Sequence, residues 1–301
     1  MKFDTYQEVT NAIAAKIEAG AMPWRAEWQG GGFKMPHRVN GEGYRGINVV
    51  LLWLSAMERG LTGQTWMTFK QALELGGAVR KGEKGTRIVF FKTLKIDGEG
   101  DSGEAESRTV PMLRTYTVFN ADQIDGLPAR FATADAGTGT APLRDAEKET
   151  ALRSCGADII EGGTRACYSV SEDVVRMPDF HRFHDVTGYL ATLAHELCHW
   201  TGHKTRLDRF AQGKPAKESY AFEELVAELG AAFIGARLGI AGDHFENHAA
   251  YLSGWLEIMQ QDKRAIFRAA SAAQAAADMV LANAGTPASH AAPASLELIA
   301  A

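Results

Sequence analysis

The sequence predicts an α+β chain of two domains: a front domain that mixes helices with strands, and a mainly helical second domain with a small sheet. Segments 87–94 and 109–120 are rich in β-branched and aromatic residues, which favours a pair of strands. Beyond an Ala-, Gly- and Thr-rich stretch, apolar residues recur at helical spacing. We predict a front domain at 1–131, a linker at 132–142, a second domain at 143–285 and a tail at 286–301.

The front domain alternates apolar helices with glycine-rich breaks, and its strand pair lies near its end. Glycines stop its helices and shape a tight basic turn before the first strand. Helices are predicted at 3–19, 49–59 and 68–75. The basic turn is predicted at 79–86, and the acidic loop between the two strands at 97–107.

The second domain is predicted to begin with a helix and a hairpin-like pair of short strands, followed by another strand and three helices. The last helix is expected to be continuous, because apolar residues and alanines recur along its whole length. The predicted helices are 145–155, 187–203, 218–239 and 244–283, and the predicted strands are 159–160, 166–170 and 174–177.

The segment 187–203 contains an H-E-x-x-H pattern formed by His195, Glu196 and His199. Positions four apart lie on one face of a helix, so both imidazoles can reach one ion. Glu196 can then hold a water molecule and take its proton. A solvated helix face is the alternative, but the surrounding helix is apolar and would leave these polar groups half buried. We therefore predict a metal site, with Zn²⁺ as the expected ion and Mn²⁺ as the alternative.

A third protein ligand is expected from a later helix. A third histidine three residues after Gly202 would be needed for one known arrangement, but Thr205 occupies that position. The helix 218–239 offers Glu224 and Glu228, one turn apart on a neighbouring face. We assign Glu224 as the ligand and Glu228 as the acceptor of a ring N–H from a ligating histidine. Glu223 is expected to point elsewhere.

Composition and charge narrow the class of protein. No apolar run approaches the roughly 20 residues needed to span a membrane. The N-terminus does not resemble a secretory signal, and three cysteines without ligand-like spacing suggest free thiols in a reducing cytoplasm. Residues 1–130 carry 17 Lys and Arg against 15 Asp and Glu, and five of these acids cluster between Asp97 and Glu106. The front domain is therefore basic outside that loop, which suggests a polyanionic partner.

Single-stranded nucleic acid is the polyanion that the front domain is predicted to bind. Lysine and arginine contact phosphates, and exposed aromatic rings stack on bases. The competing interpretation places the aromatic residues in the core and the glycines in a hairpin turn. The candidate residues are Lys34, Arg38, Arg45, Trp66, Arg80, Lys81, Lys84, Arg87 and Arg114, with Trp24, Trp28, Phe33 and Tyr44 as further stacking candidates.

Several short motifs, in one order along residues 1–280, resemble the ArdC-type antirestriction proteins. They are YRGIN at 44–48, WMTFKQ at 66–71, VRKGEKG at 79–85, YTVFNADQ at 116–123 and HELCHWTGH at 195–203. The front domain is also similar to the one that opens the TraC-type plasmid primases. The spacing of Glu224, Glu228 and 230–232 resembles the ImmA/IrrE-type metallopeptidases, which supports Glu224 as the ligand.

The resemblance implies a front domain that binds single-stranded DNA and a second domain with a zincin metallopeptidase fold. It further implies that the protein is plasmid-borne and protects incoming DNA from host restriction enzymes. A host restriction enzyme or another protein would be the peptide substrate. In the alternative, the protein is not a catalyst: it coats DNA or occludes the restriction enzyme, and its metal site is structural.

Overall fold

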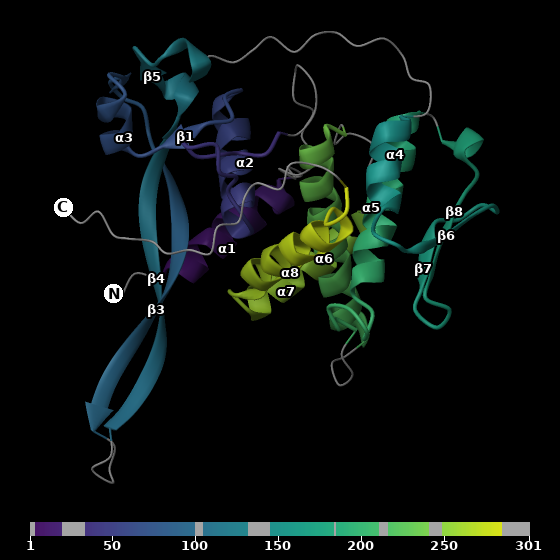
Figure 1. The fold of residues 1–301 in the computed structure, drawn as a ribbon. Coiled ribbons are helices and arrows are strands. Elements are labelled where there is room, and N and C mark those ends of the chain that lie inside the picture. The colour runs from purple at the N-terminus through teal and green to yellow at the C-terminus, as the bar shows by residue number, and fades with distance from the viewer. Residues whose placement is uncertain are drawn as a thin grey trace.

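In the computed structural model, the described residues are 4–19, 34–99, 105–131, 145–183, 185–210, 216–240 and 249–284. The predicted linker at 132–142 and tail at 286–301 lie outside them. The α+β class is confirmed: Figure 1 shows a long two-stranded hairpin beside a group of packed helices, with a small sheet at the opposite side.

The front part contains three helices and five strands among its described residues. β1 pairs with β4, β4 pairs with β3, and β2 pairs separately with β5. The elements are α1 (Thr5–Glu18), α2 (Ile47–Arg59), β1 (Trp66–Met67), α3 (Phe69–Glu74), β2 (Ala78–Val79), β3 (Thr86–Glu99), β4 (Ala105–Asn120) and β5 (Ile124–Asp125).

The second part is mainly helical, as predicted, and its described strands form one sheet of three. The elements are α4 (Ala146–Arg153), β6 (Asp158–Glu161), β7 (Cys167–Ser169), β8 (Val174–Met177), α5 (Val186–Thr201), α6 (Ala216–Leu238), α7 (Ala249–Gln261) and α8 (Ala265–Val280).

Local sequence explains where several helices begin and end. The Asp4 carboxylate accepts hydrogen bonds from the first backbone N–H groups of α1, so that helix begins at its capping residue. Thr68 and Gln71 bond each other's backbone in a capping box at the start of α3. Gly60 adopts a left-handed conformation (φ 63°) at the end of α2, which glycine does without strain.

The β3–β4 hairpin is longer than predicted. The predicted acidic loop at 97–107 is therefore too long, because β3 continues to Glu99 and β4 begins at Ala105. The register pairs Thr86 with Val118 at the base of the hairpin. Side chains alternate between the two faces, so the register decides which residues share a surface.

Two predictions for the second part are wrong. The strands at 159–160 and 166–170 do not form a hairpin, since β6 pairs in parallel with β8 and β7 pairs with β8 from the other side. The single helix predicted for 244–283 is divided into α7 and α8. Between them the Asp262 carboxylate accepts a hydrogen bond from the Arg264 N–H (2.8 Å), a local bond that competes with helix continuation.

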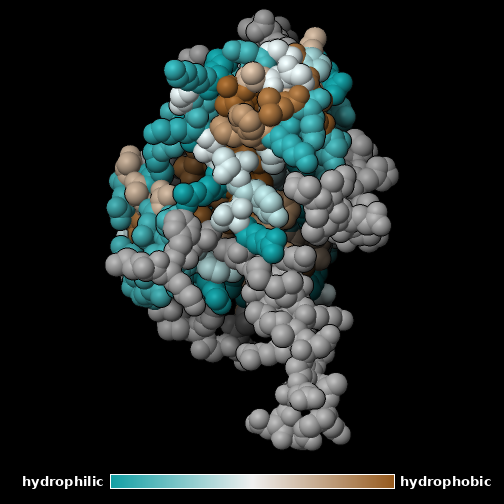
Figure 2. All heavy atoms as spheres, turned by 90° about the vertical axis from the view of Figure 1, so that its left-hand side faces the viewer, coloured by the Kyte–Doolittle hydropathy of each residue, from teal (hydrophilic) through white to brown (hydrophobic). Residues whose placement is uncertain are grey.

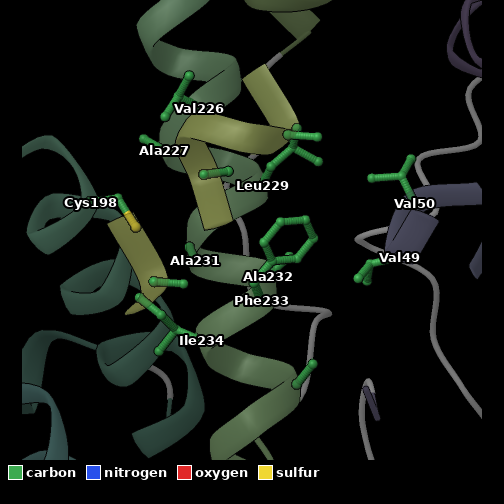
Figure 3. Packing of buried hydrophobic residues seen from close by; sticks show 14 of the residues in the cluster. Val49, Val50, Cys198, Val226, Ala227, Leu229, Ala231, Ala232, Phe233 and Ile234 are labelled. Carbon is green, nitrogen blue, oxygen red and sulfur yellow. The ribbon is translucent and has the colours of Figure 1, made fainter. Parts of the chain in front are cut away.

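The two parts share one hydrophobic core. Figure 3 shows Val49 and Val50 of α2 pointing toward Leu229 and Phe233 of α6, and all four residues belong to one buried cluster. The rings of Trp53 and Phe233 lie 5.7 Å apart between centroids. The predicted domains are therefore joined by a continuous apolar interface.

Polar contacts lie beside this interface. The Arg45 guanidinium forms an ion pair with Asp278 of α8, and Asp278 also binds Arg237 at the end of α6 (2.6 Å). The backbone N–H of Gly46 donates to the Gln274 side chain (3.2 Å). In the described ranges, no helix combines the length and the apolar character that crossing a membrane requires.

Candidate metal centre

Helix α5 positions the two predicted histidine ligands. It begins at Asp185, whose carboxylate accepts a hydrogen bond from the Gly188 N–H (2.8 Å). Its apolar residues are buried over most of its length, which fixes its rotation about its own axis. The Nε2 atoms of His195 and His199 consequently lie 3.1 Å apart, and the two ring centroids are 4.8 Å apart.

Helix α6 brings Glu224 to the same point. One carboxylate oxygen lies 3.6 Å from the Nε2 atom of His195, and the other lies 3.6 Å from the Nε2 atom of His199. An ion that binds three such donors tetrahedrally at about 2.0–2.1 Å needs them roughly 3.3 Å apart. Here the two Nε2 atoms lie 3.1 Å apart and each lies 3.6 Å from a different oxygen of Glu224. One donor atom from each residue lies within 4.8 Å of the other two, so the donor set can hold a divalent cation.

Close packing of α5 against α6 makes this convergence feasible. A Cβ atom placed on Gly230 of α6 would lie only 2.5 Å from the sulfur of Cys198 on α5. Both Cys198 and the neighbouring alanines Ala227 and Ala231 are buried, and Figure 3 shows them at the contact between the helices. Small residues at these positions let the two backbones approach closely enough for Glu224 to reach the histidines.

Glu223 supports the site, contrary to the prediction that it points elsewhere. Its carboxylate lies 3.3 Å from the Nδ1 atom of His199. Arg209 holds the same carboxylate through two N–H groups, at 2.7 Å and 3.0 Å. An acceptor on the second ring nitrogen leaves Nε2 available for a cation and fixes the ring's orientation.

Arg209 also binds the end of α5. It donates to the carbonyl of Cys198 (2.6 Å) and to the hydroxyl of Thr201 (2.8 Å). Glu223 and Arg209 are both buried, so each charge compensates the other. The ring N–H acceptor for His199 is Glu223, while the assignment of Glu228 as the acceptor for a ligating histidine stays a prediction. The sequence signals for the Glu223–Arg209 pair were an acid next to Glu224 and a basic turn ahead of α6.

Glu228 is fully buried, and its charge acts on His195. Burial lowers the pKa of His195, but the hydrogen bond with Glu224 and the negative charges of Glu228 and Glu196 raise it to about 9. Burial raises the pKa of Glu224, and its contacts with the histidines lower it more. The carboxylates therefore give the site a negative potential that favours a cation.

Glu196 and Tyr220 complete the surroundings of the three donors. Glu196 follows His195 on α5 and is mostly buried. Tyr220 lies one turn before Glu224 on α6, and its side chain forms a hydrogen bond with the Glu224 carboxylate. Sequence reasoning missed Tyr220, a residue that is 54% exposed while its side chain bonds the Glu224 carboxylate.

The basic residues predicted to contact nucleic acid fall into two groups in the structure. One group is exposed, which suits direct contact with phosphates, and consists of Lys34, Lys81, Lys84 and Arg114. The remaining arginines form ion pairs with acidic neighbours, and these pairs are Arg38 with Glu42, Arg45 with Asp278, Arg80 with Glu83 and Arg87 with Glu8.

The prediction that Trp66 stacks on bases is wrong. Its ring is only 2% exposed and packs in the core, as does the ring of Tyr44. Neither ring offers a face on which a base could stack in this structure. Trp66 pairs with Asn120 and accepts a hydrogen bond from the Tyr44 hydroxyl, contacts with residues distant in sequence that local spacing does not reveal. Trp24, Trp28 and Phe33 lie outside the described residues.

Comparison with known protein families assigns a different family model to each part. Residues 3–119 match the N-terminal domain of anti-restriction factor ArdC, and residues 146–272 match a zincin-like metallopeptidase. The second match contains the three converging donors. The protein y4eC of Sinorhizobium fredii is 40% identical over 287 residues, which cover 91% of each chain.

Two further kinds of relative agree with these matches. The DNA primase TraC of Escherichia coli is 38% identical over 295 residues, which cover 92% of this chain but only 27% of the primase. The crystal structure of the antirestriction protein ArdC from plasmid R388, in its metal-free form, is 49% identical, with a TM-score of 0.81 and coverage of 94% and 98%. The Mn(II)-bound form is 50% identical, with a TM-score of 0.78.

Proposed function

The chain belongs to the family of ArdC antirestriction proteins, and on this basis we propose that it binds single-stranded DNA, protects incoming DNA from restriction and carries a metal-dependent peptidase site. The observation that carries the peptidase part is the convergence of His195, His199 and Glu224 at the spacing of metal ligands. The observation behind the DNA part is the set of exposed basic side chains on the front half.

His195, His199 and Glu224 would hold a divalent cation. Two imidazoles and one carboxylate suit Zn²⁺, and they also suit Mn²⁺, the ion named in the R388 relative. We propose Zn²⁺ as the ion with the stronger intrinsic affinity for this donor set. Metal analysis of protein purified without added metal tests this choice. If Mn²⁺ is the main bound ion, the assignment of Zn²⁺ is wrong.

The residues around the donors fit peptide hydrolysis. A bound cation would polarise a water molecule and the peptide carbonyl. Glu196 takes the proton of the attacking water and passes it to the leaving amine nitrogen. Tyr220 donates a hydrogen bond to the Glu224 carboxylate, so its hydroxyl is close enough to the site to orient the substrate's carbonyl oxygen. Glu223 and Arg209 keep the His199 ring fixed through these steps.

The short strand β7 offers a place for an extended substrate. It lies at one edge of the three-stranded sheet and pairs with β8 on one side only among the described strands. An extended peptide can add to such an edge through main-chain hydrogen bonds. Because α5 contacts both β7 and β8, a peptide on this edge would lie next to the metal-site helix. A segment of a host restriction enzyme is the substrate that we propose.

Substitution of Glu196 by glutamine tests the catalytic part. Glu196→Gln is nearly isosteric and leaves the three donors in place, so metal binding should persist while peptide cleavage is lost. His195→Ala should lose the metal as well. Cleavage retained in a clean Glu196→Gln preparation would reject the assigned role.

An antirestriction assay separates catalysis from simple coating of DNA. If proteolysis protects the DNA, Glu196→Gln should lose protection. If protection instead survives in Glu196→Gln and is lost when Lys81 and Lys84 are replaced by glutamine, the protein protects DNA by binding it. In that case the metal site has a structural role.

The DNA part is tested by titrating the whole chain with single-stranded and duplex oligonucleotides. We expect tighter binding to the single strand, with an affinity that falls as salt is added, by roughly 0.7 in the log–log slope for each phosphate neutralised. Equal affinity for both forms, or binding that is insensitive to salt, would count against single-strand recognition.

A further inference from the structure

The base of the β3–β4 hairpin presents a face on which aromatic and basic side chains alternate. In the antiparallel register Ile88 faces Tyr116, and Phe90 faces Arg114. Directly opposed residues share one face of a sheet, so these four side chains form one block. Of the four, Ile88 is buried, whereas Tyr116 is 45% exposed and Arg114 is also exposed.

Aromatic contacts hold this block in a defined arrangement. The rings of Phe90 and Tyr116 lie 5.3 Å apart between centroids and nearly perpendicular, at 83°. The Arg38 guanidinium carbon lies 5.6 Å from the Phe90 centroid and 5.3 Å from the Tyr44 centroid. Phe90 is thus enclosed by its neighbours, while the Tyr116 ring remains accessible at the edge of the block.

We propose that Arg38, Phe90, Arg114 and Tyr116, named here the Tyr116 platform, bind single-stranded nucleic acid by stacking one base on Tyr116. The inference rests on the proposed single-strand binding and assigns it a surface. The exposed Tyr116 ring packs against Phe90, which faces Arg114 across the strands and lies under the Arg38 guanidinium. An aromatic face for one base therefore has two basic groups nearby for the adjoining phosphates. Glu42 forms an ion pair with Arg38 of the platform.

Stacking on Tyr116 would also explain a preference for single strands. A base within a duplex has both faces covered by its neighbours, so it cannot stack on the ring without leaving the helix. An unpaired base is available at much lower cost. The phosphate contacts of Arg114 alone would not distinguish the two forms, because duplex DNA carries the same backbone charge.

The exposed apolar surface on α3 is the main competitor for this role. Figure 2 shows apolar atoms gathered near the top of the face on which α3 lies, and Phe69 and Leu73 are its large exposed side chains. The ring centroids of Phe69 and Phe119 lie 6.3 Å apart. Phe119 is three positions after Tyr116 on β4, so the two side chains point to opposite faces of the strand. The exposed Asp125 and the paired Glu83 bind Arg80 close by, which makes this surface less attractive to phosphates.

Phe69 therefore provides a matched control for Tyr116. Both are exposed aromatic residues of the front half, and Phe69 is 52% exposed. The full chain and its variants Tyr116→Ala, Tyr116→Phe, Arg114→Gln and Phe69→Ala are titrated with a labelled oligothymidylate at several salt concentrations, and binding is followed by fluorescence anisotropy. Thermal unfolding of each variant shows whether it is folded.

Tyr116→Ala is expected to weaken binding on the order of tenfold or more, the loss of one stacked base. Tyr116→Phe should bind like the parent chain, because stacking needs the ring and not the hydroxyl. Arg114→Gln should reduce the salt slope by about 0.7, the contribution of one phosphate contact. Phe69→Ala should have no effect.

The possible failures have different meanings. If the parent chain does not bind the oligonucleotide, the proposed single-strand binding itself is wrong. If the parent chain binds and Tyr116→Ala binds equally well, the platform is overturned while the proposed function stands. A loss confined to Phe69→Ala would transfer the binding surface to α3. A Tyr116→Phe variant as weak as Tyr116→Ala would show that the hydroxyl, not ring stacking, matters, and would also overturn the inference.

Discussion

Replacing Gly230 by alanine tests whether the distance between α5 and α6 determines the metal site. The added Cβ atom would lie 2.5 Å from the sulfur of Cys198, whereas ordinary contacts are 3.4–4 Å. The two helices must therefore separate locally by about 0.9 Å, or the buried sulfur must move by as much. His199 follows Cys198 directly, so the displacement is transmitted to a ligand.

The energetic cost follows from two opposing effects. Overpacking a well-packed interior costs about 1–3 kcal/mol. Alanine is the better helix former than glycine by about 1 kcal/mol. The Gly230→Ala variant should therefore be less stable than the parent by about 0–2 kcal/mol. Metal affinity should fall more clearly, because ligand positions tolerate displacements of only about 0.5 Å.

A second substitution on the facing helix makes the reasoning quantitative. In Cys198→Ala the sulfur is removed, and the nearest remaining atom to the new Cβ is the Cys198 Cβ at 3.4 Å, an ordinary contact. The double variant Cys198→Ala/Gly230→Ala should therefore regain metal affinity. The cycle of four proteins should show a favourable coupling of about 1–3 kcal/mol between the two positions.

Thermal unfolding with and without Mn²⁺ or Zn²⁺, together with a direct metal titration of all four proteins, measures both effects. Cys198→Ala alone is the control for loss of the thiol and should keep its metal. Two outcomes would refute the reasoning: Gly230→Ala with the parent's metal affinity, or a double variant that binds metal no better than Gly230→Ala.

Three further predictions concern parts of the structure that support the site or the fold. Glu223→Gln leaves the buried Arg209 without its counter-charge, so the free energy of unfolding, measured with denaturant, should fall by about 3–5 kcal/mol. Metal titration should show an affinity about 10- to 100-fold weaker. An unchanged stability and an unchanged metal affinity would exclude a supporting role. Residues 1–131 alone expose the apolar face of α2 and should bind a hydrophobic dye and unfold below the parent's temperature; an equally stable fragment would contradict the shared core. The hydrogen bond from Arg206 lowers the pKa of Asp173 to about 2, below its unfolded value of 3.8. The stabilisation from this carboxylate is therefore complete above about pH 4, is lost as the pH falls toward 2, and amounts to at most about 1 kcal/mol because Asp173 is partly exposed. The variant Asp173→Asn should lose less stability than the parent chain over that pH interval.

Much of the local structure could be predicted from the sequence. The i, i+4 spacing of His195 and His199 requires both imidazoles to share a helix face, and the structure brings them together with Glu224. The starts of α1 and α3 follow from capping residues that act within a few positions of the chain. The strands around the hairpin follow from β-branched and aromatic composition.

Long-range pairing was beyond the reach of the sequence. The parallel pairing of β6 with β8 joins strands separated by β7, and no local pattern specifies which neighbour a short strand will choose. The burial of Trp66 depends on residues brought together only by folding. Its aromatic ring was consistent with both a binding surface and a core, and the tertiary environment decided between them.

The same distinction explains the assignment of the acidic residues of α6. A helix with one apolar face shows which side chains point inward, but the middle of α6 is buried on every side, as Leu225, Val226 and Ala227 are all fully buried. The sequence by itself predicted that this helix brings a carboxylate to the two histidines, and Glu224 lies beside them. The rotation of α6 against α5, set by close packing at Gly230, decided that Glu223 would bind His199 and Arg209, because only contacts between helices distinguish faces that are equally apolar.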